Sequence, residues 1–150
     1  MLHFKNSRTI LVVDDEVGPR EALRMILQNK YNVLTTENPQ EAMDTVSSGS
    51  VDIVLLDIKM PRINGLTLLK AMKAIAPDIE VVLVTAYPNT QSAIEAMEYG
   101  AYDYIIKPFD KDKIEAVVRK GIIRRTQRKL EKNMASNLMA EIYQRFCHKD

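Results

Sequence analysis

The chain alternates short apolar segments with longer stretches in which apolar residues recur at helical spacing. The apolar segments span residues 10–13, 53–56, 81–84 and 104–106, and a weaker one with two threonines spans residues 33–36. Short apolar runs without alternation are typical of strands buried on both faces of a parallel sheet. The pattern therefore predicts five short strands.

Helical signals follow each predicted strand. Pro19 suits the first turn of a helix, and Asn38 with Pro39 has the form of an N-cap followed by a proline at the first helical position. Gly49 and Gly100 stand where two of the helices should stop. Strands that alternate with helices predict right-handed βαβ crossovers and a parallel sheet with helices on both faces. The apolar residues that predict the buried faces of the first four helices are Leu23, Ile26, Leu27, Ala42, Met43, Val46, Leu68, Leu69, Met72, Ile75, Ala93, Ile94, Ala96 and Met97.

The last predicted helix is longer than the domain needs. From Asp110, which suits an N-cap, the chain continues to Asp150 without a proline and with Gly121 as its only glycine. Its first three turns have apolar residues that can cover the sheet. Beyond them apolar residues recur every fourth position, which predicts an amphipathic helix but does not favour a regular long coiled coil. The residues of this second stretch are Leu130, Met134, Leu138, Ile142 and Phe146.

Composition narrows the class of protein only slightly. The chain has 150 residues, about one domain, with 21 Lys and Arg against 20 Asp and Glu, so no overall charge favours nucleic acid or a membrane as partner. Cys147 is the single cysteine, which excludes an internal disulfide and fits a reducing compartment. No apolar run approaches the roughly 20 residues of a membrane span, and the first eight residues lack the apolar core of a signal peptide. The protein is expected to be cytoplasmic, with no membrane partner.

Functional side chains follow four of the five predicted strands. Asp14 and Asp15 follow the first strand, Asp57 ends the third, Thr85 ends the fourth and Lys107 follows the fifth. In a parallel sheet these ends lie at one edge, where ligands bind. Taken singly, each residue has an ordinary interpretation as a turn residue, a strand residue or a surface cation. The presence of all of them at one edge favours a functional site.

The chemistry that these residue types allow is phosphoryl transfer. Carboxylates that converge raise one another's pKa unless a cation lies among them, and oxygen ligands without nearby His or Cys suit Mg²⁺ better than Zn²⁺. Asp57 stands alone on the central strand and is the candidate nucleophile, whereas Asp14 and Asp15 are candidate metal ligands. Lys107 would supply a second positive charge and Thr85 a hydroxyl donor.

A metal-dependent phosphatase that forms an aspartyl phosphate is the enzymatic alternative. Such an enzyme needs a second catalytic acid just after the nucleophile, whereas Ile58 and Lys59 follow Asp57. The sequence therefore favours a phosphoacceptor over a phosphatase.

These motifs resemble the receiver domain of bacterial two-component response regulators. The resemblance covers residues 8–125 and implies an α/β fold: a flavodoxin-like, doubly wound (βα)5 three-layer sandwich with a parallel sheet in the order 2-1-3-4-5. Residues 126–150 would then be an amphipathic helical extension or linker. The segment from Lys107 to Asp110 resembles the receivers of enhancer-binding transcription activators. The matching motifs are Leu11-Val12-Val13-Asp14-Asp15-Glu16, Val54-Leu55-Leu56-Asp57-Ile58-Lys59-Met60-Pro61, Asn64-Gly65, Val84-Thr85-Ala86 and Ala101-Tyr102-Asp103-Tyr104-Ile105-Ile106-Lys107-Pro108-Phe109.

The resemblance implies a phosphoacceptor site rather than an enzyme. Asp57 would accept a phosphoryl group from a sensor histidine kinase. The ligands of Mg²⁺ would be Asp14, Asp15, Asp57 and the backbone carbonyl of Lys59.

The resemblance also implies a switch. Thr85 would move toward the phosphoryl group and Tyr104 would turn inward behind it, which would reshape the surface of the fourth helix, fifth strand and fifth helix. The bond between Lys107 and Pro108 is expected to be cis. For Tyr104, an ordinary amphipathic strand position is the alternative interpretation.

Two further positions are candidates for control of the phosphoryl lifetime. Lys59 and Tyr87 stand two residues after Asp57 and Thr85, where their side chains could flank the phosphoryl group and shield it from water. A solvated lysine and a loop tyrosine are the alternative interpretation.

The sequence leaves three outputs open. The first is a receiver that controls a downstream effector domain, in transcription, and forms a homodimer through the surface of the fourth helix, fifth strand and fifth helix or through the C-terminal helix. The second is a stand-alone receiver or phosphorelay intermediate that acts by protein contact. The third is nucleic-acid binding by the basic run of residues 119–132, which no aromatic or base-reading motif accompanies. Direct nucleic-acid binding is therefore not expected, and the run is interpreted as a solvated helix face.

Overall fold

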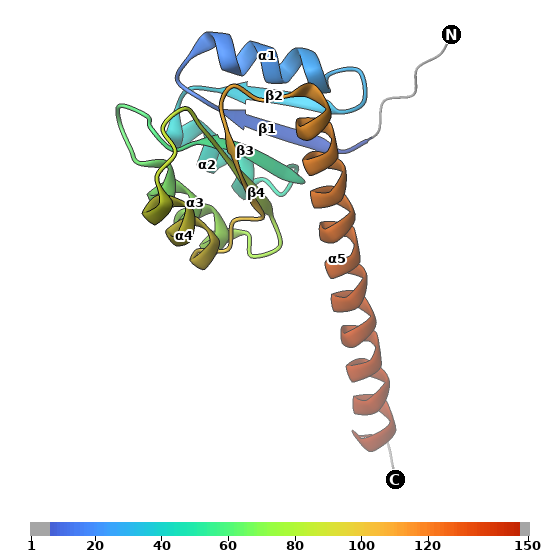
Figure 1. The fold of residues 1–150 in the computed structure, drawn as a ribbon. Coiled ribbons are helices and arrows are strands. Elements are labelled where there is room, and N and C mark those ends of the chain that lie inside the picture. Colours follow the sequence, from blue (N-terminus) through green and yellow to red (C-terminus); the bar gives the residue numbers. More distant parts are fainter. Residues whose placement is uncertain (1–6, 148–150) are drawn as a thin grey trace, which may run out of the picture.

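Five parallel strands form a sheet with helices on both faces (Figure 1). The computed structural model describes residues 7–147. The last three residues of the predicted extension lie outside this range. The elements are β1 (Thr9–Val13), α1 (Val17–Leu27), β2 (Asn32–Thr36), α2 (Pro39–Ser47), β3 (Ile53–Asp57), α3 (Gly65–Ile75), β4 (Glu80–Thr85), α4 (Thr90–Glu98), β5 (Asp103–Ile106) and α5 (Lys111–Cys147).

The strand order is β2-β1-β3-β4-β5, so the predicted doubly wound topology is confirmed. β3 lies at the centre, where Leu55 pairs with Val12 of β1 on one side and with Val82 of β4 on the other. All residues of β3 are buried, as the unbroken apolar run predicted. The strand that ends on Asp57 is therefore held by neighbours on both edges and by helices on both faces.

Alternate residues of the strands feed two separate cores. Leu56 and Leu83 belong to the core beneath α2, α3 and α4, whereas Leu55 and Val82 belong to the core beneath α1 and α5. α1, α2 and α3 bury most of the apolar residues that their spacing predicted, such as Leu69 and Met72 in α3. The prediction was wrong for Ile75 of α3 and for Ile94 and Met97 of α4, which are exposed, and α4 buries Ala96. The result is the three-layer sandwich expected from the sequence.

Asparagine side chains begin three of the helices. Asn38 Oδ1 accepts hydrogen bonds from the backbone N–H groups of Gln40 (2.8 Å) and Glu41 (3.1 Å), which confirms the predicted cap of α2. Asn64 and Asn89 cap α3 and α4 in the same way. The loops that carry the strand-end residues therefore lead into helices with defined starts.

The last helix continues far beyond the sheet (Figure 1). α5 has 37 residues and at 1.5 Å per residue is about 55 Å long. Its first turns bury Ile114, Val118 and Ile122 against the sheet, whereas every residue from Lys129 to Cys147 is exposed. Among the helices of the described chain, none is long and apolar enough to cross a membrane.

Gly65 tests how tightly the loop after β3 packs. A Cβ atom at Gly65 would meet the carbonyl oxygen of Asp57 and would lie 2.7 Å from Ile58 Cα, both backbone atoms. Gly65→Ala should therefore destabilise the fold by about 1–3 kcal/mol, measured by denaturant unfolding. At Gly18 a Cβ meets nothing within 4 Å, so Gly18→Ala is the matched control and should be neutral or slightly stabilising. Equal stability of the two variants would contradict this packing.

Candidate functional site

Three carboxylates converge at the carboxyl edge of the sheet. Each of Asp14, Asp15 and Asp57 offers an oxygen atom, and these atoms lie within 4.8 Å of one another. Asp14 and Asp57 are 2% and 5% exposed, so water neutralises little of their charge. β1 and β3 are neighbours in the sheet, which is why residues 42 positions apart in the sequence meet here, as the strand-end pattern predicted.

Lys107 reaches this cluster from the loop after β5. Its Nζ donates a hydrogen bond to Asp14 Oδ2 at 2.7 Å and lies 3.8 Å from Asp57 Oδ1, and the side chain is 10% exposed. The bond from Lys107 to Pro108 is cis, as predicted. One lysine thus faces three acids, which leaves the cluster short of positive charge.

This imbalance is visible in Asp57. Burial, followed by the negative charge of Asp14, raises the pKa of Asp57 from 3.8 to about 7, although Lys107 acts in the opposite direction. Asp15 Oδ1 is buried and has no hydrogen-bond partner in the part of the chain that the structure describes. A cation among the three acids would relieve both conditions. The donor set is all oxygen, which fits a hard divalent ion.

The end of β4 lies beside this cluster and carries two of the predicted residues. Thr85 is fully buried, its hydroxyl accepts the backbone N–H of Tyr87 at 3.1 Å, and its carbonyl accepts the N–H of Lys107 at 2.7 Å. The Lys59 Nζ lies 4.1 Å from the centre of the Tyr87 ring, a cation–π contact. The loops that follow β3 and β4 are therefore connected through the two side chains proposed to control lifetime.

Tyr104 points into the core beneath α3 and α4. Its ring packs against that core, and its hydroxyl is buried without a hydrogen-bond partner among the residues described. A buried hydroxyl without a partner carries a desolvation cost. The switch role of Tyr104 and the alternative of an ordinary amphipathic strand position both stay predictions.

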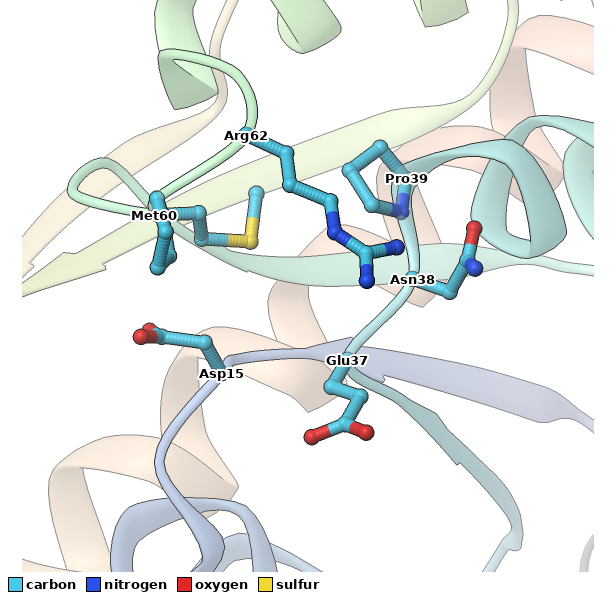
Figure 2. Close-up of a pocket in the computed structure, with 7 residues that line it drawn as sticks. Asp15, Glu37, Asn38, Pro39, Met60 and Arg62 are labelled. Carbon is cyan, nitrogen blue, oxygen red and sulfur yellow. The ribbon is translucent and has the colours of Figure 1, made fainter.

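Three side chains around the acids were not predicted from the sequence. Arg20 of α1 donates to the backbone carbonyl of Asp14 at 2.8 Å and lies 3.9 Å from Glu37. Figure 2 shows Arg62 reaching from the loop after β3 toward the loop before α2, across a pocket of about 330 Å³. The pocket is lined by Asp15, Glu37, Asn38, Pro39, Met60, Pro61 and Arg62. No sequence motif distinguishes Arg20, Glu37 or Arg62 from an ordinary charged surface residue.

Comparison with models of protein families identifies the family of this chain. Residues 10–119 match the response regulator receiver domain. This chain belongs to that family. The match includes every strand-end residue described above, and the predicted resemblance is thereby confirmed.

The relatives of this receiver are larger proteins. It is 38% identical over 114 residues to the transcriptional regulatory protein ZraR of Escherichia coli K12, covering 75% of this chain and 26% of ZraR. It is 35% identical over 129 residues to the DNA-binding transcriptional regulator NtrC of the same organism, covering 85% of this chain and 28% of NtrC. A crystal structure of NtrX from Brucella abortus in complex with ATP matches with a TM-score of 0.80 and 30% identity, over 86% of this chain and 30% of that chain. The receiver spans about a quarter of the curated relatives it matches.

The raised pKa of Asp57 predicts a pH-dependent penalty on the fold. Because the folded pKa of about 7 lies above the unfolded value of 3.8, the native state holds a proton that the unfolded state has lost between these values. Stability without metal should fall as pH rises from about 4 to about 7, by at most about 4 kcal/mol. Asp57→Asn removes this penalty, so its gain in unfolding free energy should be larger at pH 8 than at pH 4.5.

The control for this prediction is Asp44→Asn, which changes an exposed acid of α2. Its effect on stability should be the same at both pH values. A gain for Asp57→Asn that does not grow with pH would contradict the account of the acidic cluster.

Proposed function

We propose that this receiver is a phosphoacceptor switch in which Asp57 takes a phosphoryl group from a sensor histidine kinase. The observation that carries the proposal is the buried cluster of three carboxylates with Lys107 against it. Mg²⁺ would be held by Asp14, Asp15, Asp57 and the backbone carbonyl of Lys59. The orphaned oxygen of Asp15 and the all-oxygen donor set fit this ion.

The residues of the chain divide the work of transfer. Bound Mg²⁺ would neutralise oxygens of the transferring group. An oxygen of Asp57 forms the bond to phosphorus as the bond to the donor's imidazole nitrogen breaks. The donor's imidazole, protonated at its other ring nitrogen, leaves as neutral imidazole. Lys107, 3.8 Å from Asp57, supplies the second positive charge beside the developing phosphate. The result is an acyl phosphate on Asp57.

The switch follows from the position of Thr85. Its hydroxyl now accepts the N–H of Tyr87, and in the phosphorylated protein it would turn to donate to a phosphoryl oxygen. Tyr104 would settle further inward, and the surface of α4, β5 and α5 would change. That surface exposes apolar side chains, Ile94, Met97 and Ile106, which suit contact with an effector domain or with a second copy of the chain.

The output that the comparisons support best is control of transcription through an effector domain, and we propose that the protein acts in the cytoplasm. Both curated relatives described above carry names of transcriptional regulators, and this receiver covers about a quarter of each. The exposed apolar residues of α5 support a homodimer through the C-terminal helix as well as through the α4–β5–α5 surface. A stand-alone receiver or phosphorelay intermediate would use the same chemistry with protein contact as its output.

The proposed chemistry is tested by intact-protein mass after incubation with acetyl phosphate, with and without Mg²⁺. The native chain should gain the mass of one phosphoryl group only with Mg²⁺, and Asp57→Asn should gain none. Asp44→Asn, which leaves the cluster untouched, should be phosphorylated like the native chain. Phosphorylation that persists in Asp57→Asn would contradict the assignment of Asp57 as the phosphoacceptor.

The contact between Lys59 and Tyr87 predicts an effect on phosphoryl lifetime. Tyr87→Ala removes the ring that contacts Lys59, so the proposed shield of these two side chains would be lost and water should reach the phosphoryl group more easily. The free energy of a cation–π contact at an exposed site corresponds to a factor of about two to five in a rate or equilibrium constant. The rate of dephosphorylation should therefore rise by about that factor. Tyr99→Ala is the control, because it removes a Lys70–Tyr99 contact of similar length, 4.0 Å, on the α3–α4 surface. An unchanged half-life in Tyr87→Ala would reject the shielding role.

A further inference from the structure

A second group of acids lies at the opposite, amino-terminal edge of the sheet. Asp52 precedes β3, Glu80 is the first residue of β4, and Asp78 lies just before it. Glu80 is 1% exposed, and Asp52 has a side-chain exposure of 13%. Carboxylates this deeply buried need partners, because an unpaired buried charge is costly. The partners come from α5, around the point where the receiver ends and the helical extension begins.

Asp52 connects α5 to the sheet. Its Oδ1 accepts a hydrogen bond from Arg125 at 2.7 Å and lies 3.5 Å from Arg8, while its Oδ2 accepts the backbone N–H of Thr9 at 2.9 Å. The Arg125 side chain is 9% exposed. A residue of α5 is thus tied to the beginnings of β1 and β3 at once.

Glu80 and Asp78 continue the same contact along α5. Glu80 Oε1 accepts a hydrogen bond from Arg128 at 2.9 Å and lies 3.8 Å from Arg124 Nε. Asp78 accepts one from Lys132 at 3.0 Å, and this bond lowers the pKa of Asp78. Arg124, Arg128 and Lys132 recur every fourth residue, so they share the helix face that looks toward the domain. These three cations of the basic run therefore pair with acids of the domain, although their side chains keep considerable exposure to solvent.

The helix also packs tightly against the sheet just before these pairs. A Cβ atom at Gly121 would lie 2.7 Å from Ile53 Cδ1 and 3.5 Å from the Tyr102 ring. The same ring lies 5.3 Å from the Arg124 guanidinium, which stacks above it. Close packing at Gly121 and ion pairs beyond it hold α5 over consecutive turns.

We propose that Asp52, Asp78 and Glu80, with Arg124, Arg125, Arg128 and Lys132, form a basal clamp that fixes the direction of the extension. Pairs with a buried charge, here those of Asp52 and Glu80, can contribute more to a unique geometry than to stability. Together with the exposed Asp78–Lys132 pair they select one orientation of a helix whose residues from Lys129 onward are all exposed. The receiver and the extension then move as one rigid body. The clamped cations are also withheld from nucleic acid. This inference does not depend on phosphorylation.

The clamp can be tested by the distance between two spin labels. Cys147 is the single cysteine and is exposed near the end of α5, and Ser50→Cys adds an exposed second site before β3. Labelled chains are diluted into unlabelled ones so that only distances within a chain are measured. The native chain should give one narrow distance distribution, because the helix direction is fixed.

The clamp variant is Arg124→Gln, Arg128→Gln and Lys132→Gln combined. The matched control removes three exposed cations of the same helix that form no ion pair in the described chain: Arg119→Gln, Lys120→Gln and Lys129→Gln. The proposal predicts a broad distribution for the clamp variant and a narrow one for the control. Amide exchange of residues 124–132 should be about tenfold faster in the clamp variant only. Circular dichroism of both variants verifies that the domain stays folded.

Each other outcome overturns the proposal. A broad distribution in the native chain, or equal widths in native and clamp variant, shows that the clamp does not set the direction. If the distance distribution broadens equally in the clamp variant and in the control, the broadening is caused by the loss of positive charge from the helix in general. If the clamp variant unfolds, Lys132→Gln alone removes the exposed pair with Asp78, and unchanged exchange around residue 132 rejects the role of that pair. Retention of the native chain on duplex DNA at physiological salt, lost in the clamp variant, shows that the cations are free to bind it.

Discussion

The repulsion between three carboxylates at one edge of the sheet is the constraint on which this structure depends. Oxygen atoms of Asp14, Asp15 and Asp57 are held within 4.8 Å of one another by two neighbouring strands, and among the residues described Lys107 is the cation that pairs with them. The raised pKa of Asp57 reflects this unfavourable arrangement. The carboxylates stay together because the cores on both faces of the sheet fix the strands that carry them. In the proposed switch, a cation and a phosphoryl group would change that charge, and Thr85 would transmit the change.

Much of the fold and of this site could be predicted from the sequence. Short apolar runs, the cap at Asn38 and helical spacing are local signals, and the observed sheet follows from them together with the handedness of βαβ units. Asp57 and Thr85 were identifiable because parallel strands place their ends at one edge. Local pattern and topology together were enough to bring these residues to one place.

The pairings between distant side chains could not be predicted. Arg20 and Arg62 beside the acidic cluster, and Glu80 beneath the extension, look like ordinary surface residues in the sequence. Their partners depend on the exact path of loops and on the direction of α5, which no short motif encodes. The basic run of residues 119–132 shows the consequence: its composition suggested a solvated face, and the structure pairs four of its cations with acids of the domain.

We thus propose separate tasks for the two edges of the sheet, one for chemistry and one for holding the extension. The central claim concerns the first, and mapping the phosphorylated residue tests it most directly. After brief exposure to acetyl phosphate and Mg²⁺, borohydride reduces an aspartyl phosphate to homoserine, which peptide mass spectrometry locates. The account predicts homoserine at position 57 alone. Homoserine at position 14 or 15 instead, or a phosphoryl group on a hydroxyl or histidine side chain, would contradict it.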